Sequence, residues 1–211
     1  MELKQGFLIS IEGIDGSGKS SLAKAVSQHF LAKNIKTVLT KEPGDTELGK
    51  TIRTLVNYRE TSICPKAEYL LFAADRAQHF EEVIIPALKQ NKLIISDRMA
   101  DSSIVYQGYV RGLEIEMIKK INSWAMCGIE PNLTIYLKID LKTANDRIQQ
   151  RAEKLTAFEK EKIDFTKKLI EHFDQLFQYK KNSLIIDGTP ELNIVINSCI
   201  QEIEKWLSNQ I

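Results

Sequence analysis

Cysteine is scarce in this chain. The 211 residues include three cysteines, Cys64, Cys127 and Cys199, which stand far apart and lack the close spacing of metal ligands. Isolated cysteines of this kind are typical of reduced thiols that pack as small apolar residues in a core, in a reducing compartment. We therefore expect neither a disulfide-held scaffold nor a cysteine metal site.

Long apolar runs are also missing. A helix that spans a bilayer needs about 20 apolar residues in succession, and no segment approaches that length. The first residues, MELKQGFLIS, show no export signal ahead of the first apolar segment. The expectation is a cytoplasmic protein without a membrane partner.

Neither sign of charge is in excess. The chain has 29 lysines and arginines against 28 aspartates and glutamates, a net charge of +1, so it offers no broad basic surface for nucleic acid. Hydrophobic residues make up 43% and charged residues 27%, without an internal repeat, low-complexity tract or linker. This composition indicates one globular domain over residues 1–211.

Short apolar segments alternate along the chain with longer stretches of helical spacing. Several of the short segments are apolar at nearly every position, which is typical of strands buried on both faces of a parallel sheet. One helix is expected to begin at Pro65 and to kink or end near Pro86, and the last helix is expected to begin near Pro190. The fold class predicted is α/β, a parallel sheet with helices on both faces. The expected strands are Phe7–Glu12, Lys36–Thr40, Lys92–Ser96, Leu133–Lys138 and Ser183–Ile186.

The first strand leads into a glycine-rich loop, in the stretch FLISIEGIDGSGKSS, with the pattern G-x-x-x-x-G-K-S. Its glycines allow backbone N–H groups to turn toward a polyphosphate, and the following helix directs its positive end to the same anion. Lys19 can reach the β- and γ-phosphates, and the Ser20 hydroxyl can complete the shell of a magnesium ion. The loop predicts a nucleoside triphosphate site with Mg²⁺, against the alternative of a turn without a ligand. Its residues are Gly13, Ile14, Asp15, Gly16, Ser17, Gly18, Lys19, Ser20 and Ser21.

Charged residues that follow the other strands suggest a second anion site. Asp97, at the end of the third strand, can hold a metal-bound water or position Arg98, whose planar fork suits a phosphate. The alternative is a buried ion pair that closes the strand. Arg53, on the helix after a rigid turn at Pro43, can bind the same phosphate together with Arg98.

A base-binding face is suggested in YLLFAADRAQH. Phe72 and Arg76 are four residues apart and share one helix face, so that they can stack on a flat base and donate to its edge. A core phenylalanine is the alternative for Phe72, and His79 has no partner pattern and receives no role.

The most polar segment is DRIQQRAEKLTAFEKEKID, residues 146–164. One interpretation is a solvated pair of helices with complementary charges. The other is a mobile flap over the triphosphate, which would carry Arg147 and Arg151.

Taken in order, these motifs resemble those of the bacterial thymidylate kinases over essentially the whole chain. The motifs are FLISIEGIDGSGKSS, KEPGDTELGKTIR, YLLFAADRAQH, DRMADSSIVYQG and IIDGTPE. The resemblance implies a phosphate-loop nucleoside-monophosphate kinase with a five-stranded parallel sheet, assembled as a homodimer. The implied reaction is transfer of the γ-phosphoryl group of ATP to dTMP.

The resemblance also implies roles for single residues. Phe72 would stack on thymine, Arg76 would bind a base carbonyl, Asp15 would contact the sugar 3′-hydroxyl, and Tyr106 would lie under the sugar. The turn at Gly188 would line the adenine of ATP. Implied contacts of the acceptor nucleotide are Asp15, Pro43, Arg53, Phe72, Arg76, Arg98, Ser103, Tyr106 and Gln107.

The chain departs from the family pattern in its arginines. Lys41 stands where the family often has Arg, Gly44-Asp45-Thr46 replaces Gly-Gly-Thr, and neither the phosphate loop nor residues 155–159 of the flap contain the arginine found there in relatives. An acceptor phosphate whose second pKa is about 6 needs no strong general base, so Asp97 is interpreted as a positioning or metal-shell residue. The expected catalytic residues are Lys19, Asp97, Arg98, Arg147 and Arg151.

Two other functions are compatible with the phosphate loop. A kinase for another nucleotide or a deoxynucleoside would differ in the base pocket, and a nucleotide-gated switch or assembly ATPase would lack an acceptor site. The guanine-reading N-K-x-D pattern is absent, because KIDLK, the nearest match, has no asparagine.

Overall fold

The computed structural model describes residues 3–151 and 154–210. The expected domain range of 1–211 and the expected flap of 146–164 therefore include residues that lie outside the described part of the chain. Within residues 3–151 and 154–210, no helix has both the length and the apolar character required to cross a bilayer.

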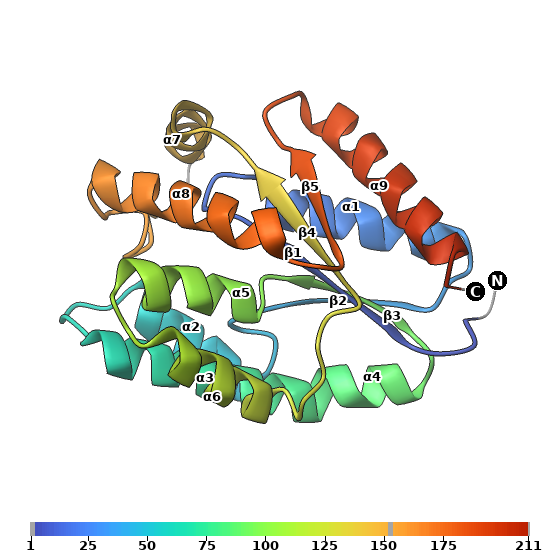
Figure 1. The fold of residues 1–211 in the computed structure, drawn as a ribbon, viewed down its shortest axis with the longest axis horizontal. Helices are drawn as coiled ribbons and strands as arrows, with labels where there is room; N and C mark the ends of the chain where they lie inside the picture. The colour runs from blue at the N-terminus through green and yellow to red at the C-terminus, as the bar shows by residue number, and fades with distance from the viewer. Residues whose placement is uncertain (1–2, 152–153, 211) are drawn as a thin grey trace.

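Five parallel strands form one sheet in the order β2-β3-β1-β4-β5 among the described residues (Figure 1). Phe7 pairs with Leu93 on one side of β1, and Ile9 pairs with Leu133 on the other. Every β1 residue is buried, as its largely apolar pattern predicts. The predicted fold class is confirmed, and each predicted strand is found, with shifts of one residue at some ends. The strands are β1 (Phe7–Glu12), β2 (Thr37–Lys41), β3 (Leu93–Asp97), β4 (Leu133–Lys138) and β5 (Ser183–Asp187).

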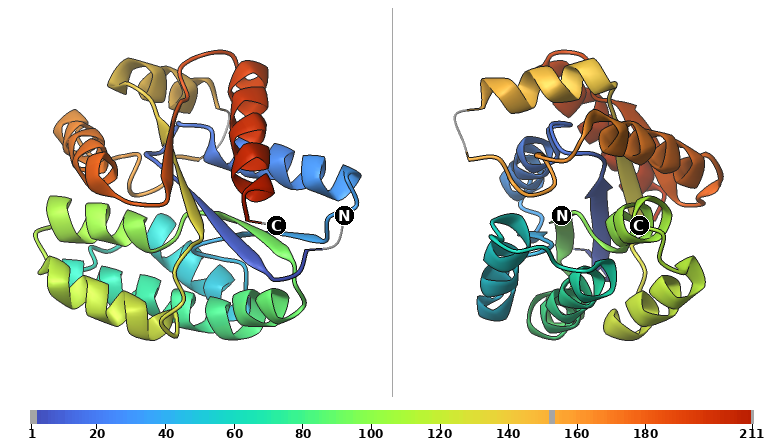
Figure 2. Two further views of the ribbon diagram at one scale, coloured as in Figure 1. Left: turned by 45° about the vertical axis from the view of Figure 1, so that its right-hand side comes forward. Right: turned by 90° about the vertical axis from the view of Figure 1, so that its left-hand side faces the viewer.

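Helices fill the connections between the strands (Figure 2). The helix predicted at Pro65 begins there, because a proline has no N–H to lose in a first turn. Its continuation becomes π-helical just before Pro86, which lies in the first turn of the next α-helix. The segments are α1 (Lys19–Ala32), α2 (Glu47–Asn57), α3 (Pro65–His79), η1 (Phe80–Ile84), α4 (Ile85–Lys89), α5 (Ala100–Ser103), η2 (Ile104–Val110), α6 (Ile115–Ala125), α7 (Leu141–Gln150), α8 (Ile163–Tyr179) and α9 (Leu192–Ser208).

The two faces of the sheet are covered by different helices (Figures 1 and 2). Phe7, Ile9 and Ile11 of β1 pack in one cluster with buried residues of α1 and α9. Leu8, on the opposite face, packs with η1 and α4. Helix α8 covers β4 on that same face, where Tyr136 stacks against the helix. Alternate side chains of a strand point to opposite faces, so both faces of β1 are buried.

The cysteine prediction is correct for Cys199 and wrong for the other two. Cys199 is buried in the core, and burial raises the pKa of its thiol to about 12. Cys64 and Cys127 are exposed, the first directly before α3 and the second in the turn after α6. All three are free thiols. Small apolar residues are not held inside when they fall in the connections rather than on a helix face.

The polar segment of residues 146–164 is the end of α7, a connection, and the beginning of α8. The interpretation as a pair of helices is therefore wrong for residues 154–162, which are turns and irregular backbone. Residues 154–162 approach α2, since the Ala157 N–H donates to the carbonyl oxygen of Asn57, the last residue of that helix.

Candidate active site

One cavity of about 560 Å³ lies beyond the carboxyl ends of β1, β2 and β3. Ligands of open parallel sheets bind at this edge, because the loops that follow the strands converge there. The cavity joins the phosphate loop to α2, α3, η2 and residues 156–159. Its lining includes the predicted residues Asp15, Gly16, Gly18, Lys19, Ser20, Ser21, Pro43, Arg53, Phe72, Arg76, Asp97, Arg98, Ser103, Tyr106, Gln107, Arg147 and Arg151.

Four predicted residues are not among those that line this cavity in the described part of the chain. Gly13 and Ser17 shape the phosphate loop from inside, and Ile14 lines a second cavity of about 350 Å³ next to the first. Gly188 packs against Leu137 and Ile139, where an added Cβ would come within 2.9 Å of either side chain.

The phosphate loop depends on two close backbone approaches. Gly13 has φ 147°, and a Cβ there would lie 2.7 Å from the Leu137 carbonyl oxygen. Gly16 has φ 81°, and its Cβ would lie 2.7 Å from the Ala144 carbonyl oxygen. Only glycine combines such φ values with this little space, so the loop sits directly against β4 and α7.

Lys19 is held inside the loop. Its Nζ donates to the Ile14 carbonyl oxygen at 2.7 Å and to Ser17 Oγ at 3.3 Å, and the side chain is buried. Burial, with the nearby charge of Arg98, lowers the pKa of Lys19 to about 8. The amine is thus poised to gain an anionic partner.

Ser20, in the first turn of α1, meets Asp97, the last residue of β3. Ser20 Oγ donates to Asp97 Oδ2 at 2.5 Å. The other carboxylate oxygen, Asp97 Oδ1, is buried and has no hydrogen-bond partner among the described residues. An unsatisfied buried carboxylate oxygen is costly, and it is a suitable ligand for a hard cation or its bound water.

Arg98 follows β3 and turns back to the phosphate loop, with φ 73°. Its Nη1 donates to the Gly13 carbonyl oxygen at 2.9 Å and to Ser102 Oγ at 3.0 Å, and its Nη2 forms an ion pair with Asp15. The guanidinium lies 5.4 Å from the centroid of the Tyr106 ring. Although burial alone would raise the pKa of Asp15, Arg98 and Lys19 hold it below its ordinary value. The structure thus brings Asp15, Arg98 and Tyr106 together.

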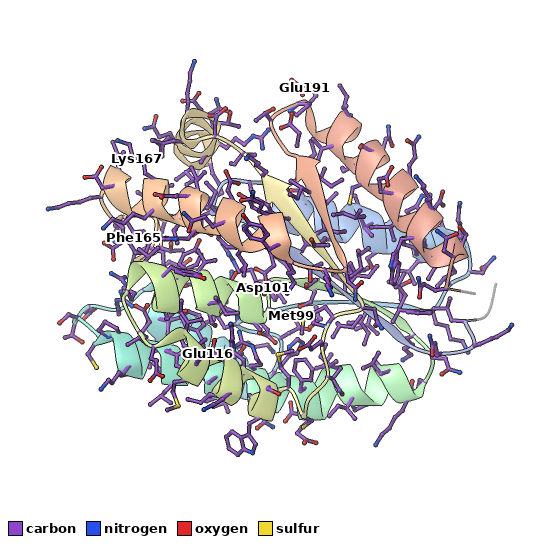
Figure 3. The ribbon with its side chains drawn as sticks, in the orientation of Figure 1. Met99, Asp101, Glu116, Phe165, Lys167 and Glu191 are labelled. Carbon is purple, nitrogen blue, oxygen red and sulfur yellow. The ribbon has the colours of Figure 1, made fainter. Side chains whose placement is uncertain are left out.

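Glu12 holds the backbone that follows Arg98, and sequence reasoning did not assign it a role. Its carboxylate accepts from the Met99 N–H at 2.8 Å and from Ser102 Oγ at 2.6 Å. Met99 and Asp101 lie beside the end of β3, at the beginning of α5 (Figure 3). Burial, together with the charge of Asp101, raises the pKa of Glu12 to about 7. A carboxylate as the last residue of a buried strand was the available signal.

At the other end of the cavity, Arg76 is almost completely buried but lines the open space with Phe72. Arg76 Nε donates to Glu42 Oε2 at 2.9 Å, and Nη2 donates to Ser103 Oγ at 3.2 Å. Phe72 is only partly buried, so the alternative of a core phenylalanine is wrong. Gln107 donates to Glu68 Oε1 at 3.0 Å beside them.

Glu42 and His79 form a buried pair that the sequence interpretation overlooked. His79 Nδ1 lies 3.0 Å from Glu42 Oε1, and its Nε2 lies 2.6 Å from Thr40 Oγ1. Although burial would raise the pKa of Glu42, Arg76 and His79 lower it. Glu42 directly follows β2 as Asp97 ends β3, so the same strand-end argument was available for it. No sequence pattern links it to His79.

Thr156, Phe158 and Glu159, between α7 and α8, line the cavity at the end that contains Phe72 and Arg76. The Ala157 N–H donates to the Asn57 carbonyl oxygen at 2.7 Å. The ring centroid of Phe158 lies 6.1 Å from that of Phe72 and 5.7 Å from that of Tyr106. The ring of Phe165, which is labelled in Figure 3 at the beginning of α8, lies edge-on to the same Tyr106 ring, with the centroids 6.2 Å apart.

The two arginines expected to act from this region have different partners. Arg147 donates at 3.3 Å to each of the Ser17, Thr189 and Pro190 carbonyl oxygens, so it joins the phosphate loop to the turn after β5. Arg151, directly after α7, forms a 2.5 Å contact with the Glu159 carboxylate. Both side chains line the large cavity.

Comparison with known proteins shows which family has a sequence of this kind. The family model described as thymidylate kinase matches residues 11–199. The chain belongs to the thymidylate kinase family. A thymidylate kinase of Thermoanaerobacter sp. (strain X514) is 40% identical over 205 residues, covering 96% of this chain and 100% of the relative. Thymidylate kinases of Kosmotoga olearia and Staphylococcus haemolyticus are 38% and 37% identical, covering 92% and 94% of this chain and 93% and 98% of their own.

Membership of the thymidylate kinase family confirms the resemblance drawn from the motifs. It also makes the chain a nucleotide-binding transferase that uses ATP, in agreement with the phosphate loop. The matched region includes the phosphate loop, Glu42 after β2, Asp97 and Arg98 at the end of β3, and the connection after α7.

Proposed function

We propose that the protein transfers the γ-phosphoryl group of ATP to dTMP, giving dTDP and ADP. A single observation carries this proposal: one cavity contains a phosphate loop at one end and the Phe72–Arg76 pair at the other. Arg98 lies between them, in reach of an acceptor phosphate. A nucleotide-gated switch or an ATPase binds no acceptor nucleotide, so neither function accounts for the end of the cavity that contains Phe72 and Arg76.

In the proposed reaction, a dTMP phosphate oxygen forms a bond to the γ-phosphorus while the bond to the β,γ-bridging oxygen breaks. The attacking oxygen is already anionic near neutral pH, because the second pKa of a phosphate monoester is about 6. Alignment and charge neutralisation then supply the rate enhancement. Lys19 acts on the donor phosphates, and Arg53 and Arg98 hold the acceptor phosphate. Arg53 is oriented by a 2.8 Å hydrogen bond from its Nη1 to the Pro43 carbonyl oxygen.

Ser20 and Asp97 fit a magnesium ion. The described residues contain no cluster of three or more His, Cys, Asp or Glu side chains that could hold a metal. However, Mg²⁺ bound mainly by water and phosphate oxygens needs only one or two protein groups. The unpartnered Asp97 Oδ1 and the adjacent Ser20 hydroxyl supply such oxygens. An ion held there by Ser20 and Asp97 would supply positive charge against the developing negative charge of the phosphates.

Replacing Asp97 by asparagine is expected to raise the Mg²⁺ concentration needed for half-maximal rate by about 10- to 100-fold, a typical cost when a metal-site partner is lost. The measurement is the initial rate against Mg²⁺ at fixed ATP. Asp164→Asn, in the exposed first turn of α8, is the matched control. An unchanged Mg²⁺ requirement in Asp97→Asn would remove Asp97 from the metal site.

We also propose that the protein is a homodimer, joined through α2, α3 and α6. These helices pack side by side on one flank of the sheet (Figure 1), and large apolar side chains stand exposed on all three. Trp124 is 81% exposed, which is unusual for a tryptophan without a partner surface. The exposed residues are Leu48, Leu55, Leu70, Met117 and Trp124.

Trp124→Glu is expected to convert the dimer to a monomer, because a carboxylate would be buried without a partner in the interface. Light scattering after size exclusion measures the mass, and the chain is 24.1 kDa. Tyr179→Glu is the control, since Tyr179 is equally exposed but lies at the end of α8. A wild-type mass of one chain would overturn the proposed dimer.

A coupled assay over a panel of acceptors tests the proposed function. The expected result is that dTMP has the highest kcat/KM among dTMP, dUMP, dCMP, UMP and CMP. Preference for CMP or UMP would support the kinase for another nucleotide. ATP hydrolysis that proceeds without transfer to any acceptor would support the ATPase.

A further inference from the structure

We infer that Asn122, a residue of α6, is a specificity-determining positioning residue that fixes the Arg76 guanidinium for the acceptor base. Asn122 is not among the residues that line the large cavity, and no motif of the sequence includes it. The inference rests on the proposed function, since it concerns the acceptor base of the same reaction.

The side-chain amide of Asn122 is buried, and both of its polar atoms have partners. Oδ1 accepts from Arg76 Nη1 at 2.7 Å and from the Tyr69 hydroxyl at 3.0 Å, whose single proton is shared with the Ile118 carbonyl oxygen at 2.9 Å. Nδ2 donates to the Ala100 carbonyl oxygen at 3.4 Å. Two donors on one side and a carbonyl on the other determine which way the amide points, so its oxygen faces Arg76.

Three elements of the fold then hold the three nitrogens of Arg76. Nε donates to Glu42 after β2, Nη1 donates to Asn122 on α6, and Nη2 donates to Ser103 on α5. A guanidinium is planar and rigid, with five N–H groups. Fixing one N–H of each nitrogen therefore fixes the direction of the remaining two. Since Arg76 lines the cavity, these two can be presented to a ligand there.

Glu42 and Asn122 contribute differently to this arrangement. Glu42 neutralises the charge of Arg76, whereas Asn122 adds a directed acceptor without adding a second buried carboxylate, which would cost free energy of desolvation. Without Asn122, the guanidinium would keep its charge partner Glu42 at Nε, but Nη1 would lose the contact that sets the angle of the plane. We therefore expect Asn122 to affect recognition of the base rather than the presence of Arg76.

A fixed pair of donors selects the chemistry of the base edge. The O4 of thymine accepts hydrogen bonds, whereas the N4 amino group of cytosine donates them. Two N–H groups in a set direction match the first and leave the second unpaired. Asn122 is thus expected to favour a pyrimidine with a carbonyl at that edge over one with an amino group.

Asn122→Leu is the principal test, because leucine has a similar size and no acceptor. The expected result is a rise of about 10- to 100-fold in the KM for dTMP, the loss typical of a hydrogen bond to a charged group. The kcat and the KM for ATP should stay within about threefold, and the preference for dTMP over dCMP in kcat/KM should fall by about tenfold. A purely structural role would lower kcat and both affinities together.

Two variants serve as matched controls. Asn122→Asp keeps an acceptor oxygen beside Arg76 and is expected to recover most of the dTMP affinity lost in Asn122→Leu. Tyr69→Phe removes the other hydrogen bond to the same oxygen and leaves the Arg76 contact, so its KM for dTMP should stay close to wild type. If Asn122→Leu does not fold, as judged by its melting curve, Asn122→Ser is used, since a serine hydroxyl is too short to reach Nη1.

The outcomes separate the inference from the proposed function. A wild-type KM for dTMP in Asn122→Leu or Asn122→Ser overturns the inference, as does an equal rise in Tyr69→Phe. If the wild-type protein does not phosphorylate dTMP, the proposed function itself fails.

Discussion

Replacing Arg151 by alanine is expected to lower kcat by about 10³-fold or more and to leave the KM for dTMP nearly unchanged. An arginine that meets the transferred group only in the transition state contributes about 10³–10⁵ in rate. Arg151 lines the cavity directly after α7 and contacts Glu159 across the connection that covers the acceptor end. Neither the phosphate loop nor residues 155–159 contain an arginine, so Arg147 and Arg151 remain as the arginines of this region that line the cavity.

Arg147→Ala is the informative comparison for Arg151. Arg147 binds three backbone carbonyl oxygens that join the phosphate loop to the turn after β5. Its loss should raise the KM for ATP and affect kcat less. Lys160→Ala, an exposed change in the same connection, should leave both constants at wild-type values. Single-turnover rates measure the chemical step, and a wild-type rate in Arg151→Ala would transfer the role to Arg147 or to a lysine.

Lys19→Met is expected to lower kcat by about 10²- to 10³-fold, the usual cost of removing one preorganised donor from a developing charge. The Lys19 amine lies inside the loop, where it donates to the Ile14 carbonyl oxygen and the Ser17 hydroxyl, and methionine fills the space without a charge. Lys24→Met, on the exposed side of α1, is the control. Wild-type turnover in Lys19→Met would contradict the assignment of Lys19 to the donor phosphates.

The depressed pKa of Lys19, about 8, predicts a pH dependence of ATP binding. Below that pH the amine of the free protein is protonated, and affinity does not gain further from its charge. Above it the amine loses its proton, so ATP binding must recover that proton and the affinity falls as pH rises. Calorimetric titration with ATP at several pH values, without an acceptor, measures how steeply the affinity for ATP falls as pH rises above about 8. This fall should vanish in Lys19→Met, and an equal fall in both proteins would contradict the role of the amine.

Where a local pattern sets the conformation, the sequence predicts the molecule closely. The strands are found within one residue of their predicted ends. The nearly continuous apolar runs of β1, β3 and β4 require burial on both faces, whereas the edge strands β2 and β5 are partly exposed. The phosphate loop is found because its glycines are demanded by local backbone geometry, at Gly13 and Gly16 in particular. Asp97 and Arg98 line the cavity as expected, because residues at the ends of parallel strands gather at one edge of the sheet.

The surroundings of these residues are not local properties, and the sequence did not predict them. Glu42 and Asn122 reach Arg76 across 34 and 46 positions of the chain. Their meeting depends on how β2, α3 and α6 pack. Phe158 reaches Phe72 only because the connection after α7 crosses the acceptor end. The exposure of Cys64 and Cys127 is likewise a consequence of where the helices end.

By itself, then, the sequence determined the parallel α/β sheet, the phosphate loop and the family, since each follows from short-range patterns of apolar residues and glycines. Only the tertiary structure decided which groups orient Arg76, how Arg147 and Arg151 differ, and what covers the acceptor end. Those features depend on hydrogen bonds and ring contacts between side chains far apart in the chain. Such contacts exist only after the helices have packed on the sheet.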